Sequence, residues 1–345
     1  MVAMLKRIWC SRHAVVGAVI QWSGAGRAYE AARRPEGAII LMYHSVSDGS
    51  VDAHIDPANR LPLAVFERQM AFLSVHRRVL SLSALVDQIS RGESPPTDSV
   101  CLTFDDGYRD NLTVAAPVLA KYRLPATLYL ATGYVQHGET QWADVLHSLW
   151  LRRTVQRLSL PELGLPTTDL SSAAQAAAAR KLVHRWLLGA QREQRTRWLV
   201  EIERQLKPEG TMPRLTMNWD EARALRTRFP LFEVGGHTQD HIDLRSHTGD
   251  VAQRQIDGCA ADIRRELGVE PQHFSFPYGR WCDSTRARVS GSGWRSAVGA
   301  GHDVRIGRQS DRFAMARIEA PRGMSAFRFK TSGAFPGALS MLGLN

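Results

Sequence analysis

Two adjacent carboxylates, Asp105 and Asp106, stand directly after the apolar run at 99–104. Carboxylates at the end of a buried strand are costly unless something compensates their charge, and a bound cation or a catalytic proton can do so. Neighbouring residues of an extended chain point in opposite directions, so one carboxylate can bind a metal while the other faces a water molecule. The structural alternative is an Asx-type turn that closes the strand, with Gly107 at a positive φ.

Two histidines, His237 and His241, follow the glycine pair at 235–236. Histidines four residues apart lie on one face of a helical turn, close enough to share one ion. Alone, this spacing is more typical of two surface histidines at the start of a helix. Together with an aspartate they form a ligand set that suits Zn²⁺ first, with Co²⁺, Ni²⁺ and Fe²⁺ as alternatives, and leaves one position open for water.

Two further segments end apolar runs with residues of chemical interest. Pro277 and Gly279 shape a tight loop at 274–279, which can offer backbone N–H groups to a developing oxyanion. His44 ends the run at 38–43, and we predict that it faces the same site. The alternative for His44 is a capping or core-edge histidine.

The elements that would position these residues alternate along the chain. Short continuous apolar runs are typical of strands buried on both faces, and we expect strands at 38–43, 99–104, 126–131, 232–234, 273–276 and 294–298. Apolar residues at helical spacing predict helices at 63–75, 83–89, 108–121 and 251–267. Alternating strands and helices favour parallel βα units, and barrels of such units place their active sites at the carboxyl ends of the strands.

One stretch departs from this alternation. Residues 140–213 are rich in Arg, Trp and Ala and lack strand-like runs, so we expect a helical insertion there. The resulting organisation is a leader at 1–36, a catalytic domain at 37–330 that contains the insertion, and a tail at 331–345.

Composition bounds the remaining properties. The chain has 345 residues, 44% of them hydrophobic, and a net charge of +10. Its basic residues are spread out rather than clustered, which argues against a nucleic-acid partner. The four cysteines form no CxxC pair, so a cysteine zinc site is not expected and a reducing compartment fits. The apolar stretch Ala14–Ile20 is far too short to span a membrane, so we expect a cytoplasmic protein with weak membrane-surface association through this segment.

The motifs TFDDG at 103–107 and HTQDH at 237–241, followed by the loop at 274–279, resemble the polysaccharide deacetylases, the NodB-homology domain of carbohydrate esterase family four. The resemblance covers roughly residues 38–320. It implies a distorted (β/α)7-type barrel and a metal-dependent hydrolase that removes N-acetyl groups from acetylated amino sugars. By this resemblance the metal ligands would be Asp106, His237 and His241. Asp105 would be the general base, and the backbone N–H of Tyr278 would help to stabilise the oxyanion.

The sequence departs from the family pattern in two places. In the family, an Arg commonly opens the third motif and orients the base. Here Phe274 or Ser275 occupies that region instead. The late Leu-x-His motif, which supplies the general acid in many members, has no clear counterpart at 316–321. Without that motif, protonation of the leaving amine stays unassigned. His44 is a separate addition to the active site, because it ends a strand on the expected catalytic face and the MYHSV segment around it resembles the branch of the family that acts on poly-N-acetylglucosamine.

Two alternatives stay open: a related barrel that hydrolyses a non-sugar amide, and a non-catalytic carbohydrate-binding protein. A sugar enzyme should present an open groove with aromatic walls, for which Trp142, Trp219 and Trp281 are candidates. Buried packing is at least as good an interpretation of each of these side chains. The sequence does not indicate the oligomeric state.

Overall fold

The computed structural model describes residues 37–247, 249–301 and 304–332. The predicted leader at 1–36 lies outside these residues, and so does the predicted tail from 333 onward. Among the helices of the described residues, none combines the length and the apolar character needed to cross a membrane.

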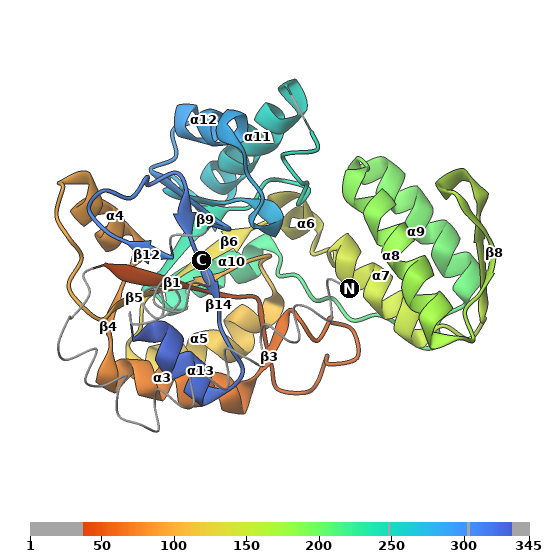
Figure 1. Ribbon diagram of the computed structural model, residues 1–345, viewed down its shortest axis with the longest axis horizontal. Coiled ribbons are helices and arrows are strands. Elements are labelled where there is room, and N and C mark those ends of the chain that lie inside the picture. The colour runs from red at the N-terminus through yellow and green to blue at the C-terminus, as the bar shows by residue number, and fades with distance from the viewer. Residues whose placement is uncertain (1–36, 248, 302–303, 333–345) are drawn as a thin grey trace, which may run out of the picture.

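A ten-stranded sheet forms the centre of the molecule (Figure 1). Its barrel strands follow one another in parallel pairs. They are β1 (Ala38–Tyr43), β5 (Ser99–Phe104), β6 (Ala126–Leu130), β9 (Phe232–Gly236), β10 (His273–Ser275), β11 (Ser296–Gly299), β13 (Met315–Ala316) and β14 (Ile318–Glu319). Two short strands join the sheet at its margins, β4 (Arg78–Leu80) beside β5 and β12 (Arg305–Ile306) antiparallel to β1.

The extended segment from Met315 to Glu319 closes the barrel. Its first half, β13, pairs with β11, and its second half, β14, pairs with β1, so the segment joins the last strand to the first. Arg317 stands between the two halves. Counted with this closing segment as one strand, the barrel has seven strands, and the predicted (β/α)7-type fold is confirmed.

Helices cover the outside of the barrel. They are α3 (Leu63–His76), α4 (Leu82–Ser90), α5 (Ala116–Tyr122), α6 (Thr132–His137), α10 (Trp219–Arg228), α11 (Asp250–Leu267), α12 (Asp283–Gly291) and α13 (Met324–Thr331). The helix predicted at 108–121 begins later than expected, because Tyr108 instead forms a β-bridge with Thr216. A π-helical turn at Asn111–Ala115 then leads into α5.

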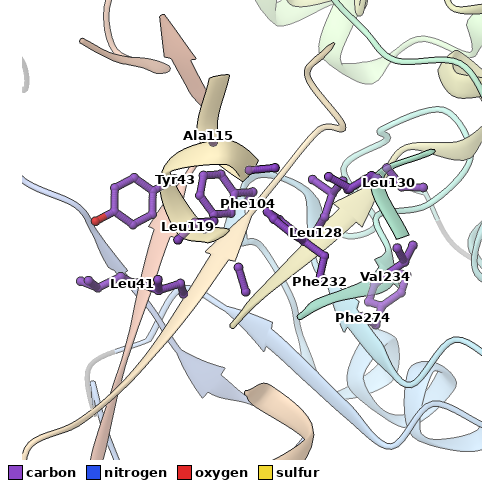
Figure 2. Packing of buried hydrophobic residues seen from close by; sticks show 14 of the residues in the cluster. Leu41, Tyr43, Phe104, Ala115, Leu119, Leu128, Leu130, Phe232, Val234 and Phe274 are labelled. Carbon is purple, nitrogen blue, oxygen red and sulfur yellow. The ribbon is translucent and has the colours of Figure 1, made fainter. Parts of the chain in front are cut away.

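Along β5, successive side chains point alternately to the helices outside the barrel and to the barrel interior. Leu102 and Phe104 belong to the large hydrophobic cluster that also holds Leu119 of α5, and Figure 2 shows Phe104 beside this helix. The residue between them in sequence, Thr103, points the other way and bonds to the carbonyl oxygen of Leu41. Because direction alternates with every residue, the same alternation directs Asp105 to the barrel interior.

A helical lobe, defined as residues 142–206, lies beside the barrel (Figure 1). It contains α7 (Trp142–Arg152), α8 (Ala173–Gly189), α9 (Arg192–Leu206) and an antiparallel hairpin of β7 (Arg157–Leu160) and β8 (Leu165–Asp169). The lobe has a hydrophobic cluster of its own, with buried residues from every one of these elements.

The hairpin contradicts the expectation that this stretch contains no strands. Leu158 and Leu160 are buried in the lobe cluster while Arg157 is exposed, so β7 has the alternation of a half-buried strand. The strands are short and pair only with each other, and the turn at Pro161 and Gly164 lies inside the run. Four or five residues are too few for the pattern to stand out from the helical composition around it.

A remaining pair of short strands leads to the site. β2 (Ser45–Ser47) follows directly after His44 and pairs with β3 (Arg60–Pro62). Asn111 donates a hydrogen bond from its amide to the carbonyl oxygen of His44 at 2.8 Å, which fixes the chain at the carboxyl end of β1.

Candidate metal and catalytic site

A sharp turn after β5 presents the two carboxylates. The N–H of Asp105 still bonds to the carbonyl of Tyr43, at 3.0 Å, and so continues the sheet. Asp106 and Gly107 then adopt left-handed conformations with φ of 77° and 70°. A Cβ at Gly107 would lie 2.9 Å from the side chain of Leu130, so the turn requires glycine there. Gly107 thus has the positive φ that was expected for it, and this turn is what aims the two carboxylates.

The loop after β9 carries the two histidines, and the helical turn predicted for them is wrong. Thr238 and His241 have left-handed φ values of 62° and 48°, and no helix begins before α11. The physical reason is that the N–H groups of Thr132 and Gly133, at the start of α6, bind the carbonyls of residues 238 and 239 at 3.2 and 2.9 Å. The loop is held by another helix's free N–H groups instead of by its own hydrogen bonds.

Asp106, His237 and His241 nevertheless come together as expected. Nε2 of His241 lies 3.2 Å from Oδ1 of Asp106, and Nε2 of His237 lies 3.6 Å from the same oxygen. All three residues are buried, and one candidate ligand atom from each lies within 4.8 Å of the others.

The hydrogen bonds around the histidines leave both Nε2 atoms facing this point as lone pairs. Nδ1 of His237 lies 2.7 Å from the carbonyl oxygen of Ser275, which can only accept, so Nδ1 carries the proton. Nδ1 of His241 lies 3.0 Å from the hydroxyl of Tyr278, and that hydroxyl donates to the carbonyl of His241 at 3.2 Å. The Tyr278 oxygen therefore accepts from Nδ1, and this fixes the tautomer of His241.

This arrangement fits a divalent cation. Two imidazole lone pairs and a carboxylate oxygen repel one another unless something positive lies between them. Oδ1 of Asp106 is buried, and no hydrogen-bond donor reaches it among the described residues. Burial also lowers the pKa of His237 to about 4, which keeps this imidazole neutral and able to coordinate. A set of two histidines and one carboxylate suits Zn²⁺ and its neighbours in the first transition series.

Asp105 has a partner that the sequence analysis missed. Arg317, from the closing strand, donates from Nη1 to Oδ1 of Asp105 at 2.7 Å and from Nη2 to Oδ2 at 2.6 Å. The same guanidinium also bonds to Thr103 at 3.1 Å and to Ser275 at 2.8 Å. Both partners of the ion pair are almost fully buried, with side-chain exposures of 1% and 4%.

The charges around the two carboxylates hold both in the ionised form. Burial acts to raise the pKa of Asp105, but Arg317 and then His237 outweigh it, and the net shift is downward. Burial likewise acts to raise the pKa of Asp106, but His241 outweighs it, and this pKa also falls below its usual range. Both carboxylates are therefore negatively charged, and each could accept a proton or bind a cation.

These groups open onto one cavity of about 450 Å³. His44 and Tyr278, predicted from the sequence, both line it. The helical lobe contributes residues that the sequence analysis did not single out, Arg180 and His184 of α8. Asp144 of α7 also lines the cavity and accepts a hydrogen bond from the Tyr108 hydroxyl at 2.7 Å; burial raises the pKa of this carboxyl to about 8.

The three tryptophans proposed for a sugar groove are placed differently from one another. Trp142 is buried in the lobe cluster with His184 against it, at 4.9 Å between ring centroids. Trp219 is buried and donates to Gln136. Trp281 donates to the carbonyl of Ala300, a residue of the cavity wall. None of the three indoles lines the cavity itself, so packing is the better interpretation of Trp142 and Trp219.

Comparisons with known proteins agree with this picture. The chain matches the family model described as polysaccharide deacetylase over residues 92–158 and 195–297. It is 34% identical over 99 residues to YxkH of Bacillus subtilis (strain 168), whose name assigns it to the polysaccharide deacetylases. That match covers 28% of this chain and spans 33% of the length of YxkH.

Solved structures share the fold. The Streptococcus pyogenes deacetylase PplD, in complex with acetate, superposes with a TM-score of 0.57 at 18% identity, over 86% of this chain and 99% of that one. IcaB from Ammonifex degensii superposes with a TM-score of 0.54 at 17% identity, over 87% of this chain and 98% of that one. With the matched motifs and the seven-stranded barrel in place, the chain belongs to the polysaccharide deacetylase family.

Proposed function

We propose that the protein is a metal-dependent hydrolase that removes N-acetyl groups from acetylated amino sugars in oligosaccharides, polysaccharides or their precursors. The observation that carries this proposal is the convergence of Asp106, His237 and His241 beside a second, separately held carboxylate, Asp105, in one cavity. Three ligands with an adjacent ionised base is the arrangement that hydrolysis of an amide by an activated water requires. Membership of the polysaccharide deacetylase family supports an amino-sugar substrate.

In this proposal each residue has one task. Asp106, His237 and His241 would hold the ion, which when bound supplies Lewis acidity to the attacking water and to the acetamide carbonyl. Asp105, kept ionised by Arg317, takes the proton from the attacking water. The backbone N–H of Tyr278 donates to the oxyanion that develops on the carbonyl oxygen.

The test is acetate release from short N-acetylglucosamine oligomers by the purified protein. We expect release with added Zn²⁺ or Co²⁺ and its loss after treatment with a chelator, restored by returning the metal. Tight stoichiometric metal binding without acetate release would point instead to a different amide substrate. Oligosaccharide binding with neither metal nor release would support the non-catalytic alternative.

We further propose that His44 protonates the leaving amine. It lines the cavity with Asp105, and its backbone is fixed by Asn111. We expect His44→Gln to lower kcat on acetamido sugars ~10²–10³-fold, within the range of general-acid catalysis. An aryl acetate ester should lose far less, because a phenolate leaves without protonation.

The control for this variant is His76→Gln, which changes an exposed histidine on α3. Equal losses of rate on the amide and on the ester would show that His44 is not the acid.

A further inference from the structure

We propose that Arg192 and Arg195, on α9 of the helical lobe, are positioning residues for the metal ligand His241. The inference rests on the metal site proposed above, but not on the identity of the substrate. Its basis is that both guanidinium groups hold Asp240, the residue directly before His241 in the chain.

Arg195 is the more deeply placed of the two. It is buried, with 1% of its surface exposed, although a buried cation is costly unless it is well bonded. Its Nη1 donates to the carbonyl oxygen of Asp240 at 2.8 Å, and its Nε donates to the carbonyl of Leu187 at 2.7 Å. The guanidinium also lies 5.2 Å from the ring centroid of Trp142.

The contact with Leu187 links Arg195, on α9, to the end of the neighbouring lobe helix α8. Leu187 lies in the last turn of α8, where helix carbonyls have no partner within the helix and the helix dipole favours a cation. Arg195 therefore joins the end of α8 to the histidine loop through one planar group. The family match is interrupted at 159–194, so α8 belongs to a part of this chain that the family model does not describe.

The contact with Asp240 acts on the geometry of His241. The peptide unit between residues 240 and 241 rotates with the φ of His241, and a bond to its carbonyl oxygen restricts that rotation. His241 has a left-handed φ of 48°, a conformation that costs a non-glycine residue about 1 kcal/mol or more. Such a backbone needs support from its surroundings if the imidazole is to stay aimed at Asp106.

Arg192 holds the side chain of the same residue. Its Nη1 donates to Oδ1 of Asp240 at 2.9 Å, and its guanidinium lies 4.9 Å from the ring centroid of Tyr134. Gln255 of α11 binds the other carboxylate oxygen and the N–H of Asp240. The lobe and the barrel therefore share the side chain of Asp240, the barrel holds its N–H, and the lobe alone holds its carbonyl among the hydrogen bonds of the described residues.

A second connection supports the same ligand. Tyr278, whose hydroxyl sets the tautomer of His241, packs against the hydrophobic cluster of the lobe. The lobe thus reaches His241 both through its backbone and through the partner of its ring.

The test measures metal affinity and needs no substrate. We would determine the affinity of the metal-free protein for Zn²⁺ and Co²⁺ by competition with a chromophoric chelator, and record the visible spectrum of the Co²⁺ form. We expect Arg195→Met to weaken binding ~10–100-fold, as loss of an outer contact to a metal ligand does. The Co²⁺ spectrum should change with it. The matched control, Arg197→Met on an exposed position of the same helix, should bind as the wild type does.

Arg192→Gln keeps the test decisive if Arg195→Met does not fold. Its side chain is 22% exposed, so the change disturbs packing less than one at the fully buried Arg195, and we expect a several-fold weaker affinity. Wild-type affinity in the folded variants, even with a lower Tm, would mean that these arginines only hold the lobe together, and the inference would be wrong. A wild-type protein that binds no divalent ion would overturn the metal site itself.

Discussion

Replacing Asp105 with Asn should abolish most acetate release while leaving the metal bound. Asparagine has nearly the same shape and can still accept from Arg317, but it cannot take a proton from the attacking water. Because general-base catalysis typically contributes ~10²–10⁴-fold, we expect kcat/KM to fall by this factor. Acetate release and metal content, measured on the same preparation, check the prediction.

The neighbouring residue provides the matched control. Asp106→Asn removes the negative charge that the two Nε2 atoms face at 3.2 and 3.6 Å and replaces one carboxylate oxygen with an amide nitrogen, so we expect loss of bound metal together with loss of activity. The two variants differ by one position in the chain and by the face to which the carboxylate points. If Asp105→Asn lost its metal as well, Asp105 would be a ligand and the division of roles would be wrong.

Much of this site could be predicted because it depends on local rules. Period-two alternation along β5 separates Asp105 from the outward-facing Phe104, and a strand buried on both faces explains the continuous apolar run. The same reasoning located β1, β6, β9 and β10 within a residue or two at either end. Parallel strands meet at one edge of the barrel, so residues that follow them were expected together.

Where prediction failed, contacts from distant parts of the chain decided the outcome. The histidine spacing suggested a helical turn, but α6 takes the carbonyls of residues 238 and 239. Spacing alone cannot reveal that competition, since the donors lie more than a hundred residues earlier. The three residues predicted as ligands still lie together, because side chains at i and i+4 can also meet across a tight loop.

Arg317 shows more clearly that sequence spacing does not reveal contacts between residues far apart in the chain. Its partner Asp105 lies 212 residues away, and no motif links them. The one local signal was a charge inside the apolar segment at 315–318, which a strand buried on both faces tolerates only with a buried partner. The Arg expected near Phe274 is absent from that place, and the closing strand supplies a guanidinium to the same carboxylate. Asp105, the proposed base, therefore still has an arginine bonded to it, but from a different strand.

The second prediction with a large expected effect concerns the buried ion pair between Arg317 and Asp105. In Arg317→Met, Asp105 stays buried but loses both of its charge-assisted hydrogen bonds. Removal of one partner of a buried ion pair typically costs ~3–5 kcal/mol of folding stability, because the other charge is left uncompensated. Thermal unfolding should show a clearly lower Tm. The control is Arg312→Met, an exposed arginine five residues earlier, which should change little.

The same variant should also alter the pH dependence of the reaction, which separates positioning of the base from simple loss of structure. Arg317 holds the pKa of Asp105 below its usual range against the effect of burial, so its removal lets burial raise that pKa. Less of the base is then ionised at a given pH, and the acid limb of kcat/KM should move to higher pH. In the Asp105→Asn background the substitution of Arg317 should no longer shift that limb, because the titrating group is gone. An unchanged acid limb in the folded single variant would mean that Arg317 braces the barrel closure without tuning the base.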